Sequence, residues 1–236
     1  MNFYYDLHLH SCLSPCGDDD ATPANLAGMC ALAGLDIVAL TDHNTCGNCR
    51  SFIQAAERLG LLALAGMELT TAEEIHVVCL FPDVDKAEAF SSYVHDRLPP
   101  IRNKPGIFGP QLYMDSEDTV LGEEERLLSN ATSIGIYETA PVVASFGGFC
   151  FPAHIDRPSN SLISQLGLWD PSLPFALAEF SLHCPPDFHL RPDLKGLRFI
   201  TNSDAHALET IPDAAQSMDI PEKNAQSVLQ WLKNGC

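Results

Sequence analysis

Seven short apolar runs, most of them separated by helical segments, constrain the fold of this chain more than any other feature. They lie at about residues 3–9, 36–41, 61–66, 75–81, 149–153, 176–181 and 198–202. Such runs are typical of buried β-strands, and their alternation with helices favours a parallel β/α sheet or barrel. The 236 residues fit one domain, since β/α barrels reach roughly 200–250 residues undivided.

The first run carries polar residues where a buried strand would need apolar ones, in the segment Asp6-Leu7-His8-Leu9-His10-Ser11. Because successive side chains of a strand point to opposite faces, Asp6, His8 and His10 should share one face. Neutral and unpaired in a core, each imidazole would cost roughly 1–3 kcal/mol. A bound cation removes that cost, although two core histidines bonded to backbone carbonyls would also fit this segment taken alone.

Later runs also lead into residues that commonly bind metals. These are Thr41-Asp42-His43-Asn44, Gly66-Met67-Glu68, His154 and Ser203-Asp204-Ala205-His206. In a β/α barrel the C-terminal ends of the strands open on one face, where active sites lie. Only a short turn separates Glu68 from the strand near Ile75, so we expect an antiparallel return that places His76 at the same face.

The candidate ligands at this face are His8, His10, Asp18, His43, Glu68, His76, His154, Asp204 and His206. Imidazole combined with carboxylate suits zinc, manganese or iron better than calcium. Nine ligands are too many for one ion, so we expect two or three divalent metal ions that share a bridging Glu68.

These motifs, in this order along almost the whole chain, resemble the polymerase and histidinol phosphatase (PHP) family. The resemblance implies an α/β fold, a distorted (β/α)7 barrel, over residues 1–236 as a single domain. It also implies three ligand sets: His8, His10, Glu68 and Asp204 for one ion, Glu68, His76 and His154 for a second, and Asp18, His43 and His206 for a third.

The chain departs from the family pattern after its first motif, where Ser14-Pro15-Cys16-Gly17 precedes Asp18-Asp19-Asp20. Counting back from Thr22-Pro23 favours Asp18 as the ligand, and Asp19 or Asp20 could replace it. Asp6 and Asp42 are expected to act behind the histidines as hydrogen-bond acceptors.

A site of this kind predicts hydrolysis of a phosphate ester by a water that the cations acidify. Glu68, Asp204 and Arg157 are the expected catalytic residues. The planar guanidinium of Arg157 matches a phosphate in a bidentate manner. A structural ion pair with Asp156 or with a surface acid is the alternative for this arginine.

The charge balance favours a small substrate. Lys+Arg 13 against Asp+Glu 31 gives a net charge of -18, which would repel long nucleic acids. We therefore expect a small phosphorylated substrate. The alternatives are a nuclease or phosphodiesterase acting on short nucleic acid or nucleotides, and a non-catalytic metal-binding regulatory module. The sequence predicts no membrane span and no signal peptide, which makes the cytoplasm the expected location, and it leaves the oligomeric state open.

Four cysteines on loops and one irregular insertion are further features of the sequence. Cys12, Cys16, Cys46 and Cys49 could meet to hold zinc or an iron-sulfur cluster, or they could be reduced loop thiols. Residues 99–121 are an irregular insertion whose later part, 111–121, is expected to form a hairpin. An insertion this long is more often functional than idle, as a lid or a subunit contact.

Overall fold

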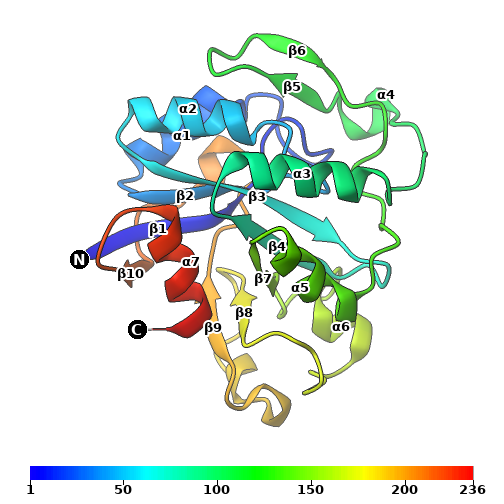
Figure 1. The fold of residues 1–236 in the computed structure, drawn as a ribbon, viewed down its shortest axis with the longest axis vertical. Helices are drawn as coiled ribbons and strands as arrows, with labels where there is room; N and C mark the ends of the chain where they lie inside the picture. The colour runs from blue at the N-terminus through cyan, green and yellow to red at the C-terminus, as the bar shows by residue number, and fades with distance from the viewer. Residues whose placement is uncertain (236) are drawn as a thin grey trace.

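The computed structural model describes residues 1–235, and its strands curl around a common interior (Figure 1). The main sheet has the order β10-β1-β2-β3-β4-β7. Its strands are β1 (Asn2–Leu9), β2 (Ile37–Leu40), β3 (Leu62–Thr70), β4 (His76–Phe81), β7 (Phe149–Pro152) and β10 (Ser217–Asp219). A separate parallel pair consists of β8 (Leu177–Phe180) and β9 (Arg198–Thr201). All seven apolar runs therefore form strands, as predicted.

The β8–β9 pair lies between the ends of β7 and β1. The Ile155 amide donates a hydrogen bond to the Glu179 carbonyl oxygen at 2.9 Å, and Leu9 forms a parallel bridge with Ala205. These contacts confirm a mixed α/β fold with a curled, half-barrel sheet. Strands β3–β4 and β4–β7 pair antiparallel, which confirms the predicted return at His76. A complete (β/α)7 barrel stays a prediction.

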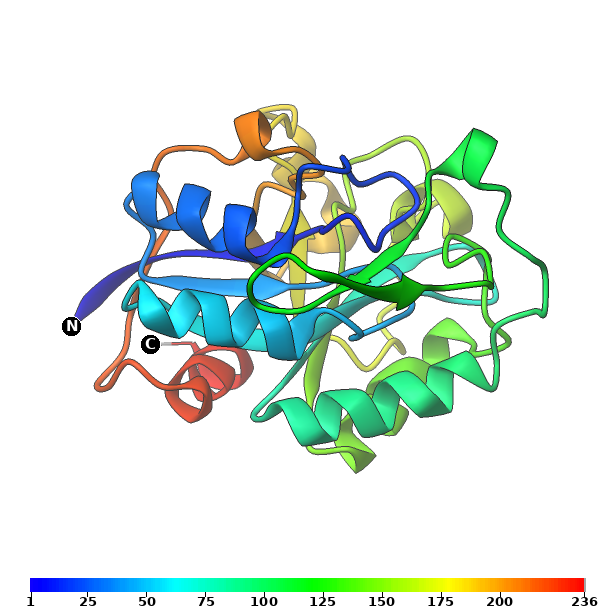
Figure 2. The ribbon, with the colours of Figure 1, turned by 90° about the horizontal axis from the view of Figure 1, so that it is seen from above.

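Helices lie on both sides of the strands (Figures 1 and 2). They are α1 (Pro23–Leu32), α2 (Cys49–Arg58), α3 (Val84–His95), α4 (Pro105–Phe108), α5 (Ile136–Ser145), α6 (Leu162–Leu166) and α7 (Ala225–Asn234), with 3-10 turns at Phe188–Leu190, Pro192–Leu194 and Leu208–Thr210. Thr22 and Asp83 accept hydrogen bonds from the first turns of α1 and α3, which fixes where these helices begin. No helix among residues 1–235 is both long and apolar enough to cross a membrane.

The insertion carries the expected hairpin, formed by β5 (Leu112–Met114) and β6 (Val120–Glu123). The hairpin lies against α2, where the Ser51 hydroxyl donates to the Met114 carbonyl oxygen at 2.7 Å. At its base, the side-chain Nε2 of Gln111 donates hydrogen bonds to the carbonyl oxygens of Glu124 and Arg126. These bonds attach the hairpin to the rest of the chain, while its use as a lid or a subunit contact stays a prediction.

Gly66 lies in β3 where the sheet leaves no room for a side chain. A Cβ atom there would come 2.8 Å from Leu80 Cδ2 and 2.9 Å from the Cys79 carbonyl oxygen. Because overpacking a core typically costs about 1–3 kcal/mol, we expect Gly66→Ala to lower the free energy of unfolding by that amount in urea denaturation. Gly122→Ala is the control, since a Cβ in that position of β6 meets nothing within 4 Å. Equal stability of the two variants would contradict the packing.

Candidate metal centre

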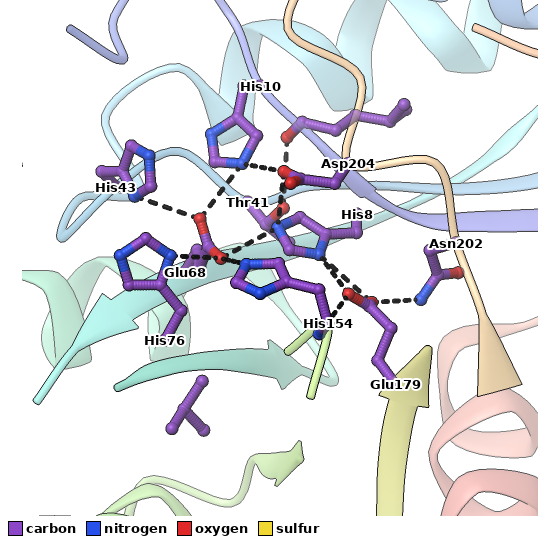
Figure 3. A network of polar contacts seen from close by, with 12 residues as sticks. His8, His10, Thr41, His43, Glu68, His76, His154, Glu179, Asn202 and Asp204 are labelled. Atoms are coloured by element: carbon purple, nitrogen blue, oxygen red, sulfur yellow. Dashed lines mark hydrogen bonds and ion pairs between the residues drawn. The ribbon is translucent and has the colours of Figure 1, made fainter. Parts of the chain in front are cut away.

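The carboxylate of Glu68, in β3 and only 1% exposed, lies among imidazole rings brought from different strands and loops (Figure 3). Its Oε1 atom is 2.9 Å from His76 Nδ1 and 3.0 Å from His154 Nε2. Its Oε2 atom is 3.0 Å from His43 Nδ1 and 3.2 Å from His10 Nε2. Side chains as far apart in sequence as His10 and His154 thus meet around one buried carboxylate.

Asp204 forms a second buried anion beside the first. Its Oδ1 atom is 3.1 Å from His10 Nε2 and 3.2 Å from His8 Nε2, while His8 Nε2 is also 3.3 Å from Glu68 Oε1. On its other side, Asp204 Oδ2 is 2.5 Å from Arg157 Nη1. His8 and His10 therefore lie between two carboxylates, and Arg157 contacts the cluster from its more exposed side.

Two of these residues have a backbone conformation that only glycine adopts easily. His154 has a φ of 28° and Asp204 a φ of 54°. Such conformations cost on the order of 1–3 kcal/mol each and concentrate at functional sites, where the surrounding structure enforces them. The fold therefore holds these two side chains in place at some expense to its own stability.

Three groups in this cluster have ligand atoms close enough to share an ion. They are His8, His10, Glu68 and Asp204; His43, Glu68 and His76; and His10, His43 and His206. The first has the same members as the set expected for one ion. The second contains His43 in place of His154, and the third contains His10 in place of Asp18. Which ions these groups hold stays a prediction.

Several buried polar atoms of the cluster lie within 3.0–3.3 Å of one another as ion-pair contacts but make no hydrogen bond within residues 1–235. They include His8 Nε2, His10 Nε2, His43 Nδ1, Glu68 Oε2 and Asp204 Oδ1. Leaving such an atom unpaired costs about 1–3 kcal/mol. Nitrogen and oxygen atoms thus converge in a buried space. Zinc, manganese and iron prefer this combination of donor atoms, so the residues present fit divalent cations.

The electrostatics of the cluster favour the metal-binding protonation states of Glu68, His43 and His206. Burial would raise the pKa of Glu68, but His76, His8 and His43 lower it well below its ordinary value. Burial lowers the pKa of His206 to about 4 and that of His43 well below its ordinary value. Near neutral pH the Glu68 carboxylate is therefore ionised and these two rings are neutral, as metal ligands must be. For His8 and His10, burial lowers the pKa but the surrounding carboxylates raise it more, to about 9 for His10, so a cation would have to displace a proton from these two rings.

The two aspartates expected behind the histidines do lie there. Asp42 Oδ1 accepts hydrogen bonds from the Ser11 amide and the Ser14 hydroxyl, both at 2.7 Å, and Ser14 Oγ lies 3.0 Å from His10 Nδ1. Asp6 accepts from the His8 amide at 3.2 Å. Asp42 thus contacts His10 through Ser14, and Asp6 contacts His8 through its backbone.

Asp18 adjoins the cluster through its backbone. Its amide donates to the His206 carbonyl oxygen at 2.8 Å, and its exposed carboxylate accepts from the Asp20 amide at 2.9 Å. The group formed by His10, His43 and His206 does not include Asp18, and a role for this carboxylate as a ligand stays a prediction.

Sequence reasoning missed Glu179, which is fully buried in β8. Its carboxylate lies 2.9 Å from His8 Nδ1 and accepts hydrogen bonds from the His154 amide at 3.0 Å and from Asn202 Nδ2 at 2.7 Å (Figure 3). The available signal was a lone carboxylate inside the apolar run 176–181. A buried charge of this kind requires partners.

The cysteines considered as a further site are dispersed. The thiols of Cys46 and Cys49 both donate to the Gly66 carbonyl oxygen, Cys12 is buried against the hairpin near the Leu112 carbonyl oxygen, and Cys16 is exposed. Within residues 1–235, no group that could hold a metal includes a cysteine. The described residues therefore do not form the four-thiol site.

A family model described as the PHP domain matches residues 6–165. No curated protein sequence matches the chain.

Solved structures with the same fold share little sequence with this chain. Endonuclease Q, in complex with a 27-mer duplex substrate with an abasic lesion, superposes with a TM-score of 0.71 at 15% identity over 99% of this chain and 57% of its own. A Bifidobacterium adolescentis protein described as a metal-dependent phosphoesterase has a TM-score of 0.62 at 18% identity over 98% and 96% of the two chains. A Chromobacterium violaceum amidohydrolase with bound sulfate has a TM-score of 0.62 at 21% identity over 94% and 93%. This chain thus spans little more than half the length of endonuclease Q.

Proposed function

The chain belongs to the PHP domain family, and we propose that it is a metal-dependent phosphoesterase that hydrolyses a small-molecule phosphate ester, on a distorted barrel of seven β/α units. The observation that carries the proposal is the buried cluster around Glu68 and Asp204, in which imidazole and carboxylate atoms converge without hydrogen-bond partners. Two or three divalent ions, zinc, manganese or iron, would satisfy those atoms.

Divalent ions, when bound, would supply a Lewis acid for the phosphoryl oxygens and lower the pKa of water. His8, His10, Glu68 and Asp204 would hold one of them. Glu68 belongs to two of the three groups, so it would contribute to holding more than one ion. The chain's own contribution is to keep these donors in fixed positions, because β1 with the residue that follows it, β3 and the segment after β9 supply them and all four residues are buried.

Arg157 is suited to hold the phosphoryl group. Its side chain is 39% exposed and pairs with Asp204 at the cluster. Together with Ser159 and Asn160 it lines a cavity of about 70 Å³ that also contacts Glu68 and other cluster residues. A guanidinium that is partly exposed can turn from the carboxylate toward an arriving phosphate and donate two hydrogen bonds to it.

Arg157→Ala is expected to lower kcat/KM for the phosphate ester by about 10–100-fold. The estimate follows because a hydrogen bond to a charged group contributes about 1.5–3 kcal/mol, and about 1.4 kcal/mol corresponds to tenfold. Steady-state kinetics with the metal-loaded enzyme measure the change. Arg191→Ala, which removes an arginine paired with Asp193, is the matched control. An Arg157→Ala enzyme as active as Arg191→Ala would remove Arg157 from the mechanism.

A nuclease is the second candidate, favoured by the likeness to endonuclease Q in complex with a lesion-containing duplex. Against it stands the net charge of -18, since a protein that binds duplex DNA normally neutralises phosphates with lysine and arginine. The chain also spans only 57% of that endonuclease. These observations favour the small substrate.

Analysis of the reaction products distinguishes the small-molecule phosphoesterase from the nuclease. Protein loaded with zinc, manganese or iron should release phosphate from one or more members of a panel of sugar phosphates, amino-alcohol phosphates and nucleotides, and should leave a duplex with an abasic site intact. Cleavage of the duplex without phosphate release would favour the nuclease. Retained metal with no hydrolysis of either would favour a non-catalytic regulatory module.

A further inference from the structure

Glu179 occupies a place where three strands meet, although it belongs to none of the three groups that could hold a metal. It lies in the middle of β8 with no exposed surface. Its carboxylate reaches β1 through His8, the end of β7 through His154 and the end of β9 through Asn202. We propose that Glu179 is a positioning residue that fixes the ring of His8 with its Nε2 lone pair toward the metal, an inference that rests on the proposed metal dependence.

The two nitrogens of the His8 ring face different carboxylates. Its Nδ1 atom lies 2.9 Å and 3.1 Å from the two carboxylate oxygens of Glu179. Its Nε2 atom points the other way, 3.2 Å from Asp204 Oδ1 and 3.3 Å from Glu68 Oε1. A carboxylate accepts hydrogen bonds and cannot donate one, so the ring proton is held on Nδ1. With Nδ1 protonated in this way, the lone pair available to a cation is that of Nε2, and a cation bound beside Asp204 and Glu68 would displace any proton held there.

Glu179 is not itself a metal ligand in this proposal, because its carboxylate oxygens have other partners. One oxygen accepts from His8 Nδ1 and from the His154 amide at 3.0 Å, and the other accepts from Asn202 Nδ2 at 2.7 Å. Both oxygens thus already accept hydrogen bonds within the chain. The same carboxylate holds the backbone of His154, whose φ of 28° is strained, so it positions one ligand by its ring and another by its main chain.

Both carboxylate oxygens of Glu179 are needed as hydrogen-bond acceptors. Asn202 cannot turn its amide around, because its Oδ1 atom accepts from the Leu7 amide at 2.9 Å. Its NH₂ group therefore has to face residue 179. A glutamine there would place its own NH₂ group against that of Asn202, or against His8 Nδ1, where it would drive the ring proton onto Nε2 and block the metal.

We expect one substitution at Glu179 to weaken zinc binding and a second substitution at Asn202 to restore it. Glu179→Gln should weaken zinc binding about 10–100-fold, the usual effect of removing such a partner. Glu179→Gln combined with Asn202→Asp should recover most of that loss, because a carboxylate at position 202 accepts from the glutamine NH₂ group and still accepts from the Leu7 amide. Glu73→Gln is the control, since Glu73 also bonds a backbone amide, that of Ile136, but does not contact the cluster ligands.

Zinc affinity is measured on the metal-free protein by competition with a chromogenic chelator, and thermal unfolding without metal shows whether each variant is folded. Long-range ¹H–¹⁵N spectra of the zinc-loaded wild-type protein should show His8 protonated at Nδ1 and coordinated at Nε2. Zinc affinity unchanged in Glu179→Gln, no recovery in the double variant, or coordination through Nδ1 would overturn the inference alone. Wild-type protein that binds no zinc, manganese or iron would overturn the proposed function and this inference with it.

Discussion

Glu68→Ala is expected to abolish metal binding and to lower phosphate release by at least about 10³-fold. The Glu68 carboxylate contacts His8, His10, His43, His76 and His154 at 2.9–3.3 Å. Without it, Asp204 is the one carboxylate left in the four-residue group. Metal ions supply several kcal/mol of transition-state stabilisation, and each 1.4 kcal/mol or so is worth tenfold in rate.

Elemental analysis and a phosphate-release assay on one sample measure both effects. Glu57→Ala is the matched control, because Glu57 is an exposed carboxylate on α2, and it should keep metal and activity. A Glu68→Ala protein with a full complement of metal would show that Glu68 is not the shared ligand. Full metal loss with activity retained would separate the metal from the reaction and overturn the proposed phosphoesterase.

The strands could be predicted because each apolar run is short and ends in polar residues. Their spacing also identified the antiparallel return from β3 to β4, since the turn between Glu68 and Ile75 is too short for a crossover. By contrast, α5 was not predicted. Pro141 lies inside this helix, and proline usually marks the end of a helix or a loop. Here the helix begins at Ile136 and continues through Pro141 to Ser145, so the local signal is misleading.

The candidate ligands could be found because histidine and glutamate are conspicuous at the ends of apolar strands. Asp18 and Glu179 show what such reasoning lacks. The direction of the Asp18 carboxylate depends on a turn in which the Asp20 amide is its donor, and no residue count reveals that bond. The partners of Glu179 come from residues 8, 154 and 202, so its role depends on how three strands are placed side by side.

The same cluster should make the protein's stability depend strongly on metal. Buried atoms such as His8 Nε2 and Asp204 Oδ1 have no hydrogen-bond partner among residues 1–235, and a bound ion would remove their desolvation penalty. A ligand that binds only the folded state stabilises it by about 4 kcal/mol when its free concentration is about 1,000 times Kd. For a chain of this size, about 1 kcal/mol shifts Tm by roughly 2–4 °C.

Removing metal with a chelator is therefore expected to lower Tm by about 8–16 °C, and adding zinc back should restore it. Scanning calorimetry or dichroism at 222 nm measures the shift. His8→Ala and Asp204→Ala each remove a donor of the four-residue group, so in these variants the chelator should change Tm far less. A wild-type Tm that does not respond to the chelator, in protein shown to carry metal beforehand, would mean that the ions bind the surface rather than the buried cluster. In that case the unpartnered atoms of His8 and Asp204 would need another explanation.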